Sequence, residues 1–286
     1  MKKAWKIVIA IAVVLALAAG GVFAVFAVKK NYAPVHRVTS VAEAKNINPY
    51  VMPIKLIAHR GYSGIAPENT LPAIAAAGLA DFYGAEFDVR LSADGEWFVM
   101  HDDDVARMTD GEGLISEMTA EEIGKLTIDA GNNVIQYPEE KVPTAREMIA
   151  SAVENGLRPV VEIKTEGADP EKYRELAEMI LSLAGDDYSV ISFSLDVLVQ
   201  MRKYLPEGEL WLLSSKVTTE QIRACVEAGI DGIDFNANHI LNHRHIKQIL
   251  DSGLLPAAWT VDNIRMVDRM YSKGVYFITT NYIQPA

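Results

Sequence analysis

From Ile54 to the C-terminus the chain alternates short apolar runs, rich in β-branched and aromatic residues, with longer amphipathic segments. Nine of the runs are candidate strands: Lys55–Ala58, Ala85–Val89, Trp97–Met100, Pro159–Ile163, Ser189–Phe193, Leu210–Leu213, Gly232–Asp234, Pro256–Trp259 and Val275–Ile278. Repeated strand–helix units with short connections predict an α/β fold with a parallel sheet, and about eight such units predict a closed barrel.

One of the nine candidate strands does not fit this repeat. Trp97–Met100 follows Ala85–Val89 after a short stretch that contains Asp94-Gly95, and Asp-Gly is a signal for a tight hairpin turn. We expect these two runs to pair as a hairpin, which leaves eight strands. The sequence therefore predicts a (β/α)₈ TIM barrel over residues 54–286. A doubly wound open sheet is the alternative, because a count of strands does not establish closure.

Several of the amphipathic segments carry the start signal of a helix. In a capping box, a Thr hydroxyl accepts a hydrogen bond from the backbone N–H three residues on, and the Glu or Gln there reaches back. The pairs that fit this pattern are Thr119 with Glu122, Thr144 with Glu147 and Thr218 with Gln221. We expect a helix to begin at each of these threonines.

The first 30 residues predict a membrane anchor. Ile7 to Val28 is a run of 22 uncharged residues, which at ~1.5 Å per helical residue spans a hydrocarbon core of ~30 Å. A cleaved signal peptide is the alternative, although its apolar region is usually shorter, at ~7–15 residues. We therefore predict an N-terminal transmembrane anchor over residues 1–30, a proline-containing linker over 31–53 and the barrel domain over 54–286.

Lysines flank the apolar run of residues 7–28 on both sides. Lys2, Lys3 and Lys6 precede it, whereas Lys29 and Lys30 follow it. Because basic residues favour the cytoplasmic side of a span, the excess on the N-terminal side predicts the orientation. We expect a single-pass protein of the cell membrane with its barrel domain outside the cytoplasm.

The folded part of the chain is acidic. The net charge is −11, and residues 31–286 alone have 22 basic and 38 acidic side chains. Such a surface repels polyphosphate, so nucleic-acid binding is not expected, and any phosphate site needs a metal ion or a few placed cations. Cys225 is the single cysteine, which excludes an intrachain disulfide and a cysteine-based zinc site. No feature of the sequence indicates an obligate protein partner.

Carboxylates stand near the ends of two predicted barrel strands. Glu86 and Asp88 are two residues apart on one strand, so their side chains share a face, and Glu162 ends another strand. The carboxyl ends of barrel strands meet at one mouth, where active sites collect. Paired carboxylates repel unless a cation lies between them, so the three acids predict a site for Mg²⁺, Ca²⁺ or Mn²⁺. A solvent-facing pair of acids is the alternative.

Histidines and cations follow the same strand ends. His59 and His101 each stand beside a charged residue, and since histidine titrates near neutrality, one imidazole can accept a proton while the other donates one. Structural histidines are the alternative. The planar guanidinium of Arg60 can donate two parallel hydrogen bonds to the oxygens of a phosphate, and the Lys164 ammonium adds a second positive charge. For Lys164 the alternative is a salt bridge to a neighbouring glutamate.

These residues stand in a series of short motifs. The motifs are HRG at residues 59–61, PENT at 67–70, E-x-D at 86–88, HD at 101–102 and E-x-K at 162–164. In order and spacing they resemble the signature of the glycerophosphodiester phosphodiesterase family, and the resemblance extends from about Leu56 to the C-terminus. It implies the same TIM barrel, a divalent metal on Glu86, Asp88 and Glu162, and His59 and His101 as an acid–base pair.

The resemblance also implies roles for further residues. Glu68 is expected to order the site, beyond the helix start that Asn69 or Thr70 supplies as N-cap. Trp259 is expected to line the substrate pocket, with a buried barrel tryptophan as the alternative. The chain departs from the family at Asn281, where similar proteins usually carry an aspartate. We interpret this as a tolerated structural change that leaves the chemistry intact.

The function that the resemblance implies is metal-dependent hydrolysis of glycerophosphodiesters to sn-glycerol 3-phosphate and an alcohol. His59 and His101 would transfer the protons, and Arg60, Lys164, Trp259 and Glu68 would bind the substrate. Two alternatives remain open. The first is a lysophospholipase D-like enzyme that takes lysolipid headgroups at the membrane through residues 7–28. The second is a non-catalytic barrel that binds polyol phosphates.

Overall fold

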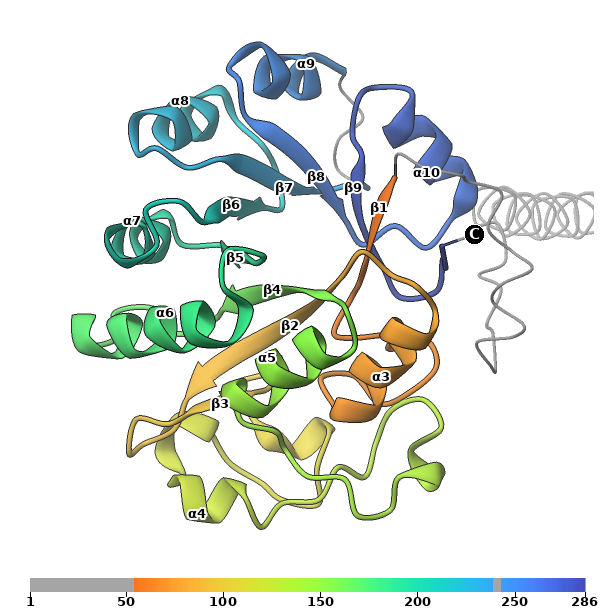
Figure 1. Ribbon diagram of the computed structural model, residues 1–286, viewed down its shortest axis with the longest axis vertical. Helices are drawn as coiled ribbons and strands as arrows, with labels where there is room; N and C mark the ends of the chain where they lie inside the picture. Colours follow the sequence, from red (N-terminus) through yellow and green to blue (C-terminus); the bar gives the residue numbers. More distant parts are fainter. Residues whose placement is uncertain (1–53, 239–242, 286) are drawn as a thin grey trace, which may run out of the picture. The chain divides into compact units, whose positions relative to one another are not determined.

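The computed structural model describes residues 54–238 and 243–285. Eight strands lie parallel in a ring, and β1 pairs with β2 on one side and with β9 on the other (Figure 1). The eight strands are β1 (Lys55–Ala58), β2 (Gly84–Leu91), β4 (Arg158–Ile163), β5 (Ser189–Ser192), β6 (Glu209–Ser214), β7 (Gly232–Asn236), β8 (Leu255–Trp259) and β9 (Phe277–Thr280). The closed ring confirms the predicted TIM barrel and excludes the doubly wound open sheet.

The ninth strand is the hairpin partner that the Asp94-Gly95 turn predicts. Strand β3 (Trp97–Val99) pairs with β2 and is antiparallel to it, with Arg90 opposite Phe98. Gly95 has φ of +85°, a conformation that a turn demands and that glycine adopts without a Cβ clash. The hairpin carries His101 to the mouth of the barrel, because Met100 N donates a hydrogen bond to Asp88 O at 3.0 Å.

The helices lie outside the ring of strands (Figure 1). They are α3 (Leu71–Leu79), α4 (Ala120–Ile123), α5 (Ala145–Glu154), α6 (Pro170–Ala184), α7 (Leu195–Tyr204), α8 (Thr219–Glu227), α9 (His243–Asp251) and α10 (Ile264–Tyr271). All three predicted capping boxes are present, with both hydrogen bonds made, at the starts of α4, α5 and α8. Asn69 and Thr70 are the two predicted caps of the helix that follows them, and Thr70 is the N-cap of α3.

The interior of the barrel is filled by side chains. Alternate residues of a strand face inward, and those of the lower barrel form a buried cluster that includes Ile57, Val160, Trp211 and Phe277. The Trp211 and Phe277 rings meet edge to face with centroids 5.0 Å apart. This apolar layer fills the barrel interior, and the polar residues at the C-terminal ends of the strands lie on top of it.

An excursion between β3 and α5 adds a second, smaller core. Residues 100–144 contain the short 3₁₀ helices η1 (Val105–Arg107), η2 (Ile115–Glu117) and η3 (Val134–Gln136), together with α4. Eight buried apolar side chains hold this segment together: Phe98, Met100, Val105, Met108, Ile115, Ile123, Ile128 and Val142. The segment follows the HD motif and positions the residues beside His101.

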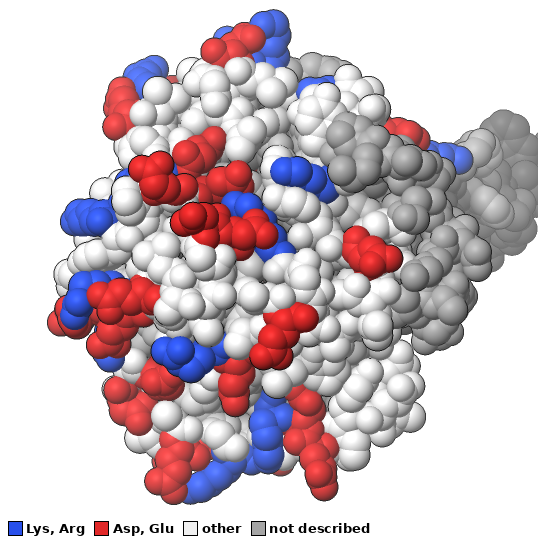
Figure 2. Space-filling model, viewed as in Figure 1, with Lys and Arg blue, Asp and Glu red and all other residues white. Residues whose placement is uncertain are grey.

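The predicted membrane anchor over residues 1–30 and the linker over 31–53 lie outside the described residues. Among the described residues, the helices are all too short or too polar to cross a membrane. Acidic and basic side chains are mixed over the face drawn in Figure 2, and the basic ones do not merge into one patch there.

Candidate active site

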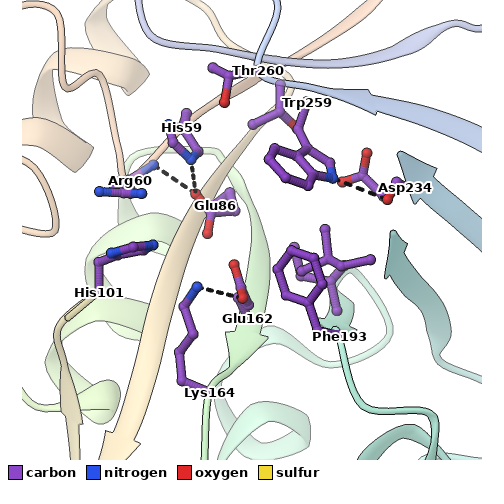
Figure 3. Close-up of a pocket in the computed structure, with 13 residues that line it drawn as sticks. His59, Arg60, Glu86, His101, Glu162, Lys164, Phe193, Asp234, Trp259 and Thr260 are labelled. Atoms are coloured by element: carbon purple, nitrogen blue, oxygen red, sulfur yellow. Dashed lines mark hydrogen bonds and ion pairs between the residues drawn. The ribbon is translucent and has the colours of Figure 1, made fainter. Parts of the chain in front are cut away.

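The C-terminal ends of the barrel strands surround a cavity of about 150 Å³ (Figure 3). Most of the predicted site residues line this cavity: His59, Arg60, Glu86, His101, Glu162, Lys164 and Trp259. Asp88 lies behind them and is 1% exposed. Glu68 lies to one side, in a second, polar pocket that also contains His59 and Arg60. The structure therefore brings together every residue that the motifs single out.

Glu86, Asp88 and Glu162 form one buried cluster on two neighbouring strands. Asp88 pairs in register with Glu162 across β2 and β4, and one oxygen from each of the three carboxylates lies within 4.8 Å of the others. Burial, together with the neighbouring carboxylates, raises the pKa of Glu86 well above its usual range and that of Glu162 to about 8. Acids held so close together in an apolar setting require a cation.

The same cluster fits a hard divalent metal ion. Glu86 Oε1 is buried and has no hydrogen-bond partner among the described residues, so it is free to coordinate. Carboxylate oxygens are the donors that Mg²⁺, Ca²⁺ and Mn²⁺ prefer, and three of them converging from a rigid sheet is a suitable protein contribution.

Two cations of the protein also contact these carboxylates. Lys164 Nζ lies 2.6 Å from Glu162 Oε1 and 3.1 Å from Asp88 Oδ1, and Arg60 Nε lies 3.6 Å from Asp88 Oδ2. Burial works against ionisation of Asp88, but Lys164 and Arg60 outweigh it and hold the pKa of Asp88 below its usual range. The predicted ion pair between Lys164 and Glu162 is thus present, and the Lys164 ammonium still faces the cavity.

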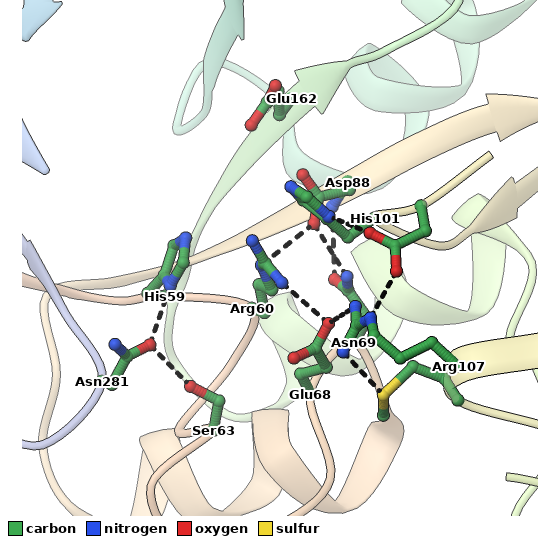
Figure 4. Close-up of polar contacts among 12 residues, drawn as sticks. His59, Arg60, Ser63, Glu68, Asn69, Asp88, His101, Arg107, Glu162 and Asn281 are labelled. Atoms are coloured by element: carbon green, nitrogen blue, oxygen red, sulfur yellow. Dashed lines mark hydrogen bonds and ion pairs between the residues drawn. The ribbon is translucent and has the colours of Figure 1, made fainter. Parts of the chain in front are cut away.

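Arg60 contacts three acids: Glu68, Glu86 and Asp88. Figure 4 shows it beside Glu68 and Asp88. Its guanidinium donates to Glu68 Oε1 at 2.8 Å, and its backbone N–H donates to Glu86 Oε2 at 2.8 Å. Arg60 itself has φ of +56°, a strained conformation for a non-glycine residue that the surrounding contacts must maintain. The next residue, Gly61, has φ of +70°, and a Cβ there would lie 2.8 Å from the Ala73 backbone carbon. The HRG motif therefore requires its glycine.

Glu68 connects Arg60 to the excursion after β3. Its Oε1 also accepts a hydrogen bond from Arg107 Nη2 at 2.6 Å. Arg107 Nε donates a second hydrogen bond, to Asp102 Oδ2. Although burial opposes ionisation, the hydrogen bond from Arg107 and the charge of Arg60 lower the pKa of Glu68. These contacts support the prediction that Glu68 orders the site.

His59 is paired with an amide. Asn281 Oδ1 lies 2.8 Å from His59 Nδ1 and also accepts from Ser63 Oγ, while Asn281 Nδ2 donates to Asp262 Oδ2. Because that amide oxygen can only accept, His59 Nδ1 carries the proton and Nε2 presents a lone pair towards Glu86, 3.9 Å away. Burial and the charge of Arg60 lower the pKa of His59 to about 4.

His101 is paired with a carboxylate. Its Nδ1 lies 2.6 Å from Asp102 Oδ1, and Asp102 is in turn bonded by Arg107. Burial lowers the pKa of His101, although Asp88 and Asp102 act in the opposite direction. The two histidines thus differ in the partner of Nδ1, which is neutral for His59 and anionic for His101.

Comparison with known proteins agrees with this geometry. Residues 59–284 match the glycerophosphoryl diester phosphodiesterase family, which is most of the chain and all of the site. The chain therefore belongs to this family. That finding confirms the resemblance that the HRG, PENT, E-x-D and HD motifs indicate.

Individual relatives differ in how far they match. A Bacillus subtilis glycerophosphodiester phosphodiesterase is 31% identical over 257 residues, which covers 80% of this chain and 84% of the relative. Human glycerophosphodiester phosphodiesterase 1 is 35% identical over 151 residues, or 52% of this chain and 46% of the relative, so the match spans only about half of the human protein. An Oleispira antarctica phosphodiesterase, solved with its product sn-glycerol-3-phosphate, has a TM-score of 0.70 at 26% identity and covers 84% of this chain and 95% of that structure.

The structure places in the site two residues, Asn69 and Asn281, for which the sequence indicates only a helix cap and a structural change. Asn69 donates to Asp88 Oδ2 at 2.8 Å and, with φ of +58°, does not cap the helix. Asn281, interpreted above as a tolerated structural change that leaves the chemistry intact, has its side chain in contact with His59. The closed barrel predicts such a contact in principle, since the last strand pairs with the first.

Aromatic residues and one further acid complete the cavity. Trp259 is half-buried and lines the cavity, with its ring 5.7 Å from that of Phe193 in an edge-to-face arrangement. Asp234, on β7, also lines the cavity and is 2% exposed. Burial and the nearby Glu162 raise the pKa of Asp234 well above its usual range.

Proposed function

We propose that this family member hydrolyses glycerophosphodiesters to sn-glycerol 3-phosphate and an alcohol. The observation that carries the proposal is the convergence of three buried carboxylates, two histidines and two cations on one cavity. The names of the Bacillus and human relatives and the product bound in the Oleispira structure support the substrate class. A barrel that only binds polyol phosphates would not need all three carboxylates together with both histidines.

Glu86, Asp88 and Glu162 would hold a divalent ion, Mg²⁺, Ca²⁺ or Mn²⁺, which supplies Lewis-acid polarisation of the phosphodiester. Arg60 and Lys164 contribute positive charge at the same wall of the cavity. Arg60 is locked by Glu68 and needs little reorganisation to receive a phosphate. Fixed charges of this kind stabilise the negative charge that develops on the phosphate oxygens.

The partners of the two histidines assign their roles. His59 is kept neutral with Nε2 as an acceptor, so it removes the proton from the nucleophile. The carboxylate of Asp102 favours the protonated form of His101, and binding of an anionic phosphodiester adds to that effect, so His101 protonates the leaving alkoxide. The family resemblance favours the glycerol 2-hydroxyl as nucleophile, with a cyclic phosphate that water then opens.

The histidines give the direct test of this mechanism. Each single variant, His59→Ala or His101→Ala, should lower kcat by ~10²–10⁴-fold, and the double variant should fall far short of additivity. A nitrophenyl ester has an acidic leaving group that needs no proton donor, so it should rescue His101→Ala much more than His59→Ala. His245→Ala, on helix α9 and outside the cavity, is the control. Near-full activity of both variants on glycerophosphodiesters contradicts the mechanism, and the opposite rescue pattern reverses the roles.

We also propose that residues 7–28 anchor the protein in the cell membrane, with the barrel outside the cytoplasm. The length of the uncharged run and the lysines around it support this. An anchor would keep the barrel domain at the membrane, which is what the lysophospholipase D alternative requires.

A further inference from the structure

Asp234 is a buried acid inside the barrel that the proposed mechanism does not use. It pairs in register with Leu213 on β6 and with Ala257 on β8, and both of these side chains belong to the apolar cluster of the barrel interior. Its position on β7 therefore directs the carboxyl inward, and it lines the same cavity as the metal-site residues (Figure 3).

One oxygen of the Asp234 carboxyl lacks a partner in the part of the chain that the structure describes. Its Oδ1 is buried and has no hydrogen-bond partner among the described residues. Trp259 Nε1 donates to the backbone oxygen of Asp234 at 3.1 Å and leaves the carboxyl unengaged. Burying a polar group without a hydrogen bond costs about 1–3 kcal/mol, so an acid in this position indicates a ligand that completes it.

The cavity has two chemically different sides. His59, Arg60, His101 and Lys164 form the charged side, where the phosphate group belongs. The opposite side, which holds Asp234, is otherwise mostly apolar. Phe193 and Trp259 lie beside Asp234 in Figure 3, and the cavity is also lined by Ile191, Leu213, Thr260 and Thr279.

A phosphodiester has two arms, and only one of them is the glycerol. The phosphate belongs on the charged side of the cavity, and the cavity continues from there to Asp234. The whole cavity, with its charged side included, has a volume of about 150 Å³, which leaves room beside Asp234 for a three-carbon polyol and not for a long chain. We therefore place the glycerol arm on the side of Asp234.

We propose that Asp234 accepts a hydrogen bond from the free terminal hydroxyl of the glycerol arm and thereby selects glycerophosphodiesters over substrates in which this hydroxyl is acylated or missing. The inference rests on the proposed phosphodiesterase function. A site that holds a buried hydrogen-bonding group rejects an analogue without the matching hydroxyl, because the group is then left unpaired. A lysolipid has an acyl chain at this hydroxyl, so Asp234 disfavours the lysophospholipase D alternative.

The test compares substrates that keep the reactive 2-hydroxyl and differ at the terminal one. They are glycerophosphocholine, its deoxy analogue built on 1,2-propanediol, and lysophosphatidylcholine. We expect the full-length protein to prefer glycerophosphocholine over the deoxy analogue by roughly 10- to 100-fold in kcat/KM. Asp234→Ala should lose that preference by slowing on glycerophosphocholine alone, and Asp234→Asn, which can still accept a hydrogen bond, should retain part of it.

Leu213→Ala is the matched control, because Leu213 lies beside Asp234 and lines the same cavity without a polar group. It should change kcat/KM for glycerophosphocholine and the deoxy analogue by the same factor. The proposal is overturned if Asp234→Ala also slows both substrates equally, which is the behaviour of a structural carboxyl that binds water. It is equally overturned if the wild-type protein does not distinguish them.

Binding of products separates this proposal from the proposed function. The affinities of glycerol 3-phosphate and 1,2-propanediol phosphate are measured by calorimetry without any turnover. If Asp234 reads the hydroxyl, wild type prefers glycerol 3-phosphate by roughly 10-fold or more and Asp234→Ala does not. A preference that persists in Asp234→Ala refutes the role of Asp234. If the preference depends on Asp234 but glycerophosphodiesters are not hydrolysed, the role stands and the enzymatic function fails.

Discussion

At the scale of single residues, the partner of each histidine decides what that histidine can do. His59 and His101 stand at equivalent strand ends, and the sequence around them does not distinguish acid from base. The structure does, because Asn281 and Asp102 hold the two Nδ1 atoms. Asp102 is adjacent to His101 in the HD motif, whereas Asn281 is 222 residues from His59, so only the first pairing could be predicted from local sequence.

Exchanging the two side chains beside His59 should move its pKa. In the double variant Asn281→Asp with Asp262→Asn, the hydrogen bond between positions 281 and 262 is kept, but the carboxylate now faces His59 Nδ1. A neighbouring negative charge favours the imidazolium, so the pKa of His59 should rise from about 4. Because a general base acts in its neutral form, the acid limb of the kcat/KM profile should shift to higher pH.

The shift is measured by the pH dependence of glycerophosphodiester turnover and by NMR titration of His59. Ser63→Ala is the control, since it removes the other donor to Asn281 Oδ1 and introduces no charge. An unchanged His59 titration in the double variant contradicts the assignment of Asn281 as its partner.

At the scale of elements, regular local signals were sufficient to predict most of the architecture. The nine strands lie where apolar runs predict them, within about two residues at each end. The three capping boxes depend on side chains three residues apart and are all confirmed. The excursion over residues 100–144 was not predicted, because its 3₁₀ helices have no period and its core depends on contacts between distant segments.

The carboxylates on β2 and β4 also have properties that depend on contacts with distant segments, which local sequence does not predict. Alternation along a strand predicts that Glu86 and Asp88 share a face, and both do reach the cluster. Their pKa values shift in opposite directions, upward for Glu86 and downward for Asp88. This difference could not be predicted from the strand, because Lys164, Arg60 and Asn69 contact Asp88 whereas Glu86 Oε1 has no hydrogen-bond partner among the described residues.

This arrangement predicts a pH-dependent stability of the metal-free protein. The Glu162 carboxyl keeps its proton in the folded state to about pH 8, whereas in the unfolded chain it titrates near 4.5. Since the folded state then binds more protons than the unfolded state, the free energy of unfolding should fall as pH rises. Between pH 6.5 and 8 the loss should be on the order of 1–2 kcal/mol, and Glu162→Gln should reduce it.

Urea unfolding at a series of pH values in the presence of a chelator measures this slope. The site histidines have lowered pKa values, so they add a rise in stability with pH that extends through the unfolded-state histidine pKa of 6.5 into this window. Because this rise is the same in the wild type and in Glu162→Gln, the difference between their two slopes reports Glu162. Glu154→Gln, an exposed acid on α5, should keep the wild-type slope. Adding Mg²⁺, Ca²⁺ or Mn²⁺ should oppose the loss, because the ion binds the ionised carboxylates. A slope that Glu162→Gln leaves unchanged contradicts the assignment.

At the scale of the whole molecule, closure of the barrel is what assembles the site. The pairing of β1 with β9 places the C-terminal residues beside His59, and the pairing of β1 with β2 places Arg60 beside Glu86. Strand counting predicted eight units, but closure itself is a tertiary property that no segment encodes alone.

The predicted anchor concerns the whole chain as well. If residues 7–28 anchor the chain as proposed, full-length protein should remain with the membrane fraction after a high-salt wash, and its N-terminal sequence should begin at or near Met1. A chain that begins at residue 31 should be released, which serves as the control. A soluble mature form that begins after Ala18 or Ala27 identifies the stretch as a cleaved signal peptide.

The most direct test of the account is turnover of glycerophosphocholine by the full-length protein before and after metal removal. Chelation should abolish the release of sn-glycerol 3-phosphate, and Mg²⁺, Ca²⁺ or Mn²⁺ should restore it in the wild type but not in Glu86→Gln, in which the carboxylate charge is lost and the backbone contact to Arg60 can persist. Undiminished turnover by the chelated protein contradicts the claim that Glu86, Asp88 and Glu162 hold a catalytic metal.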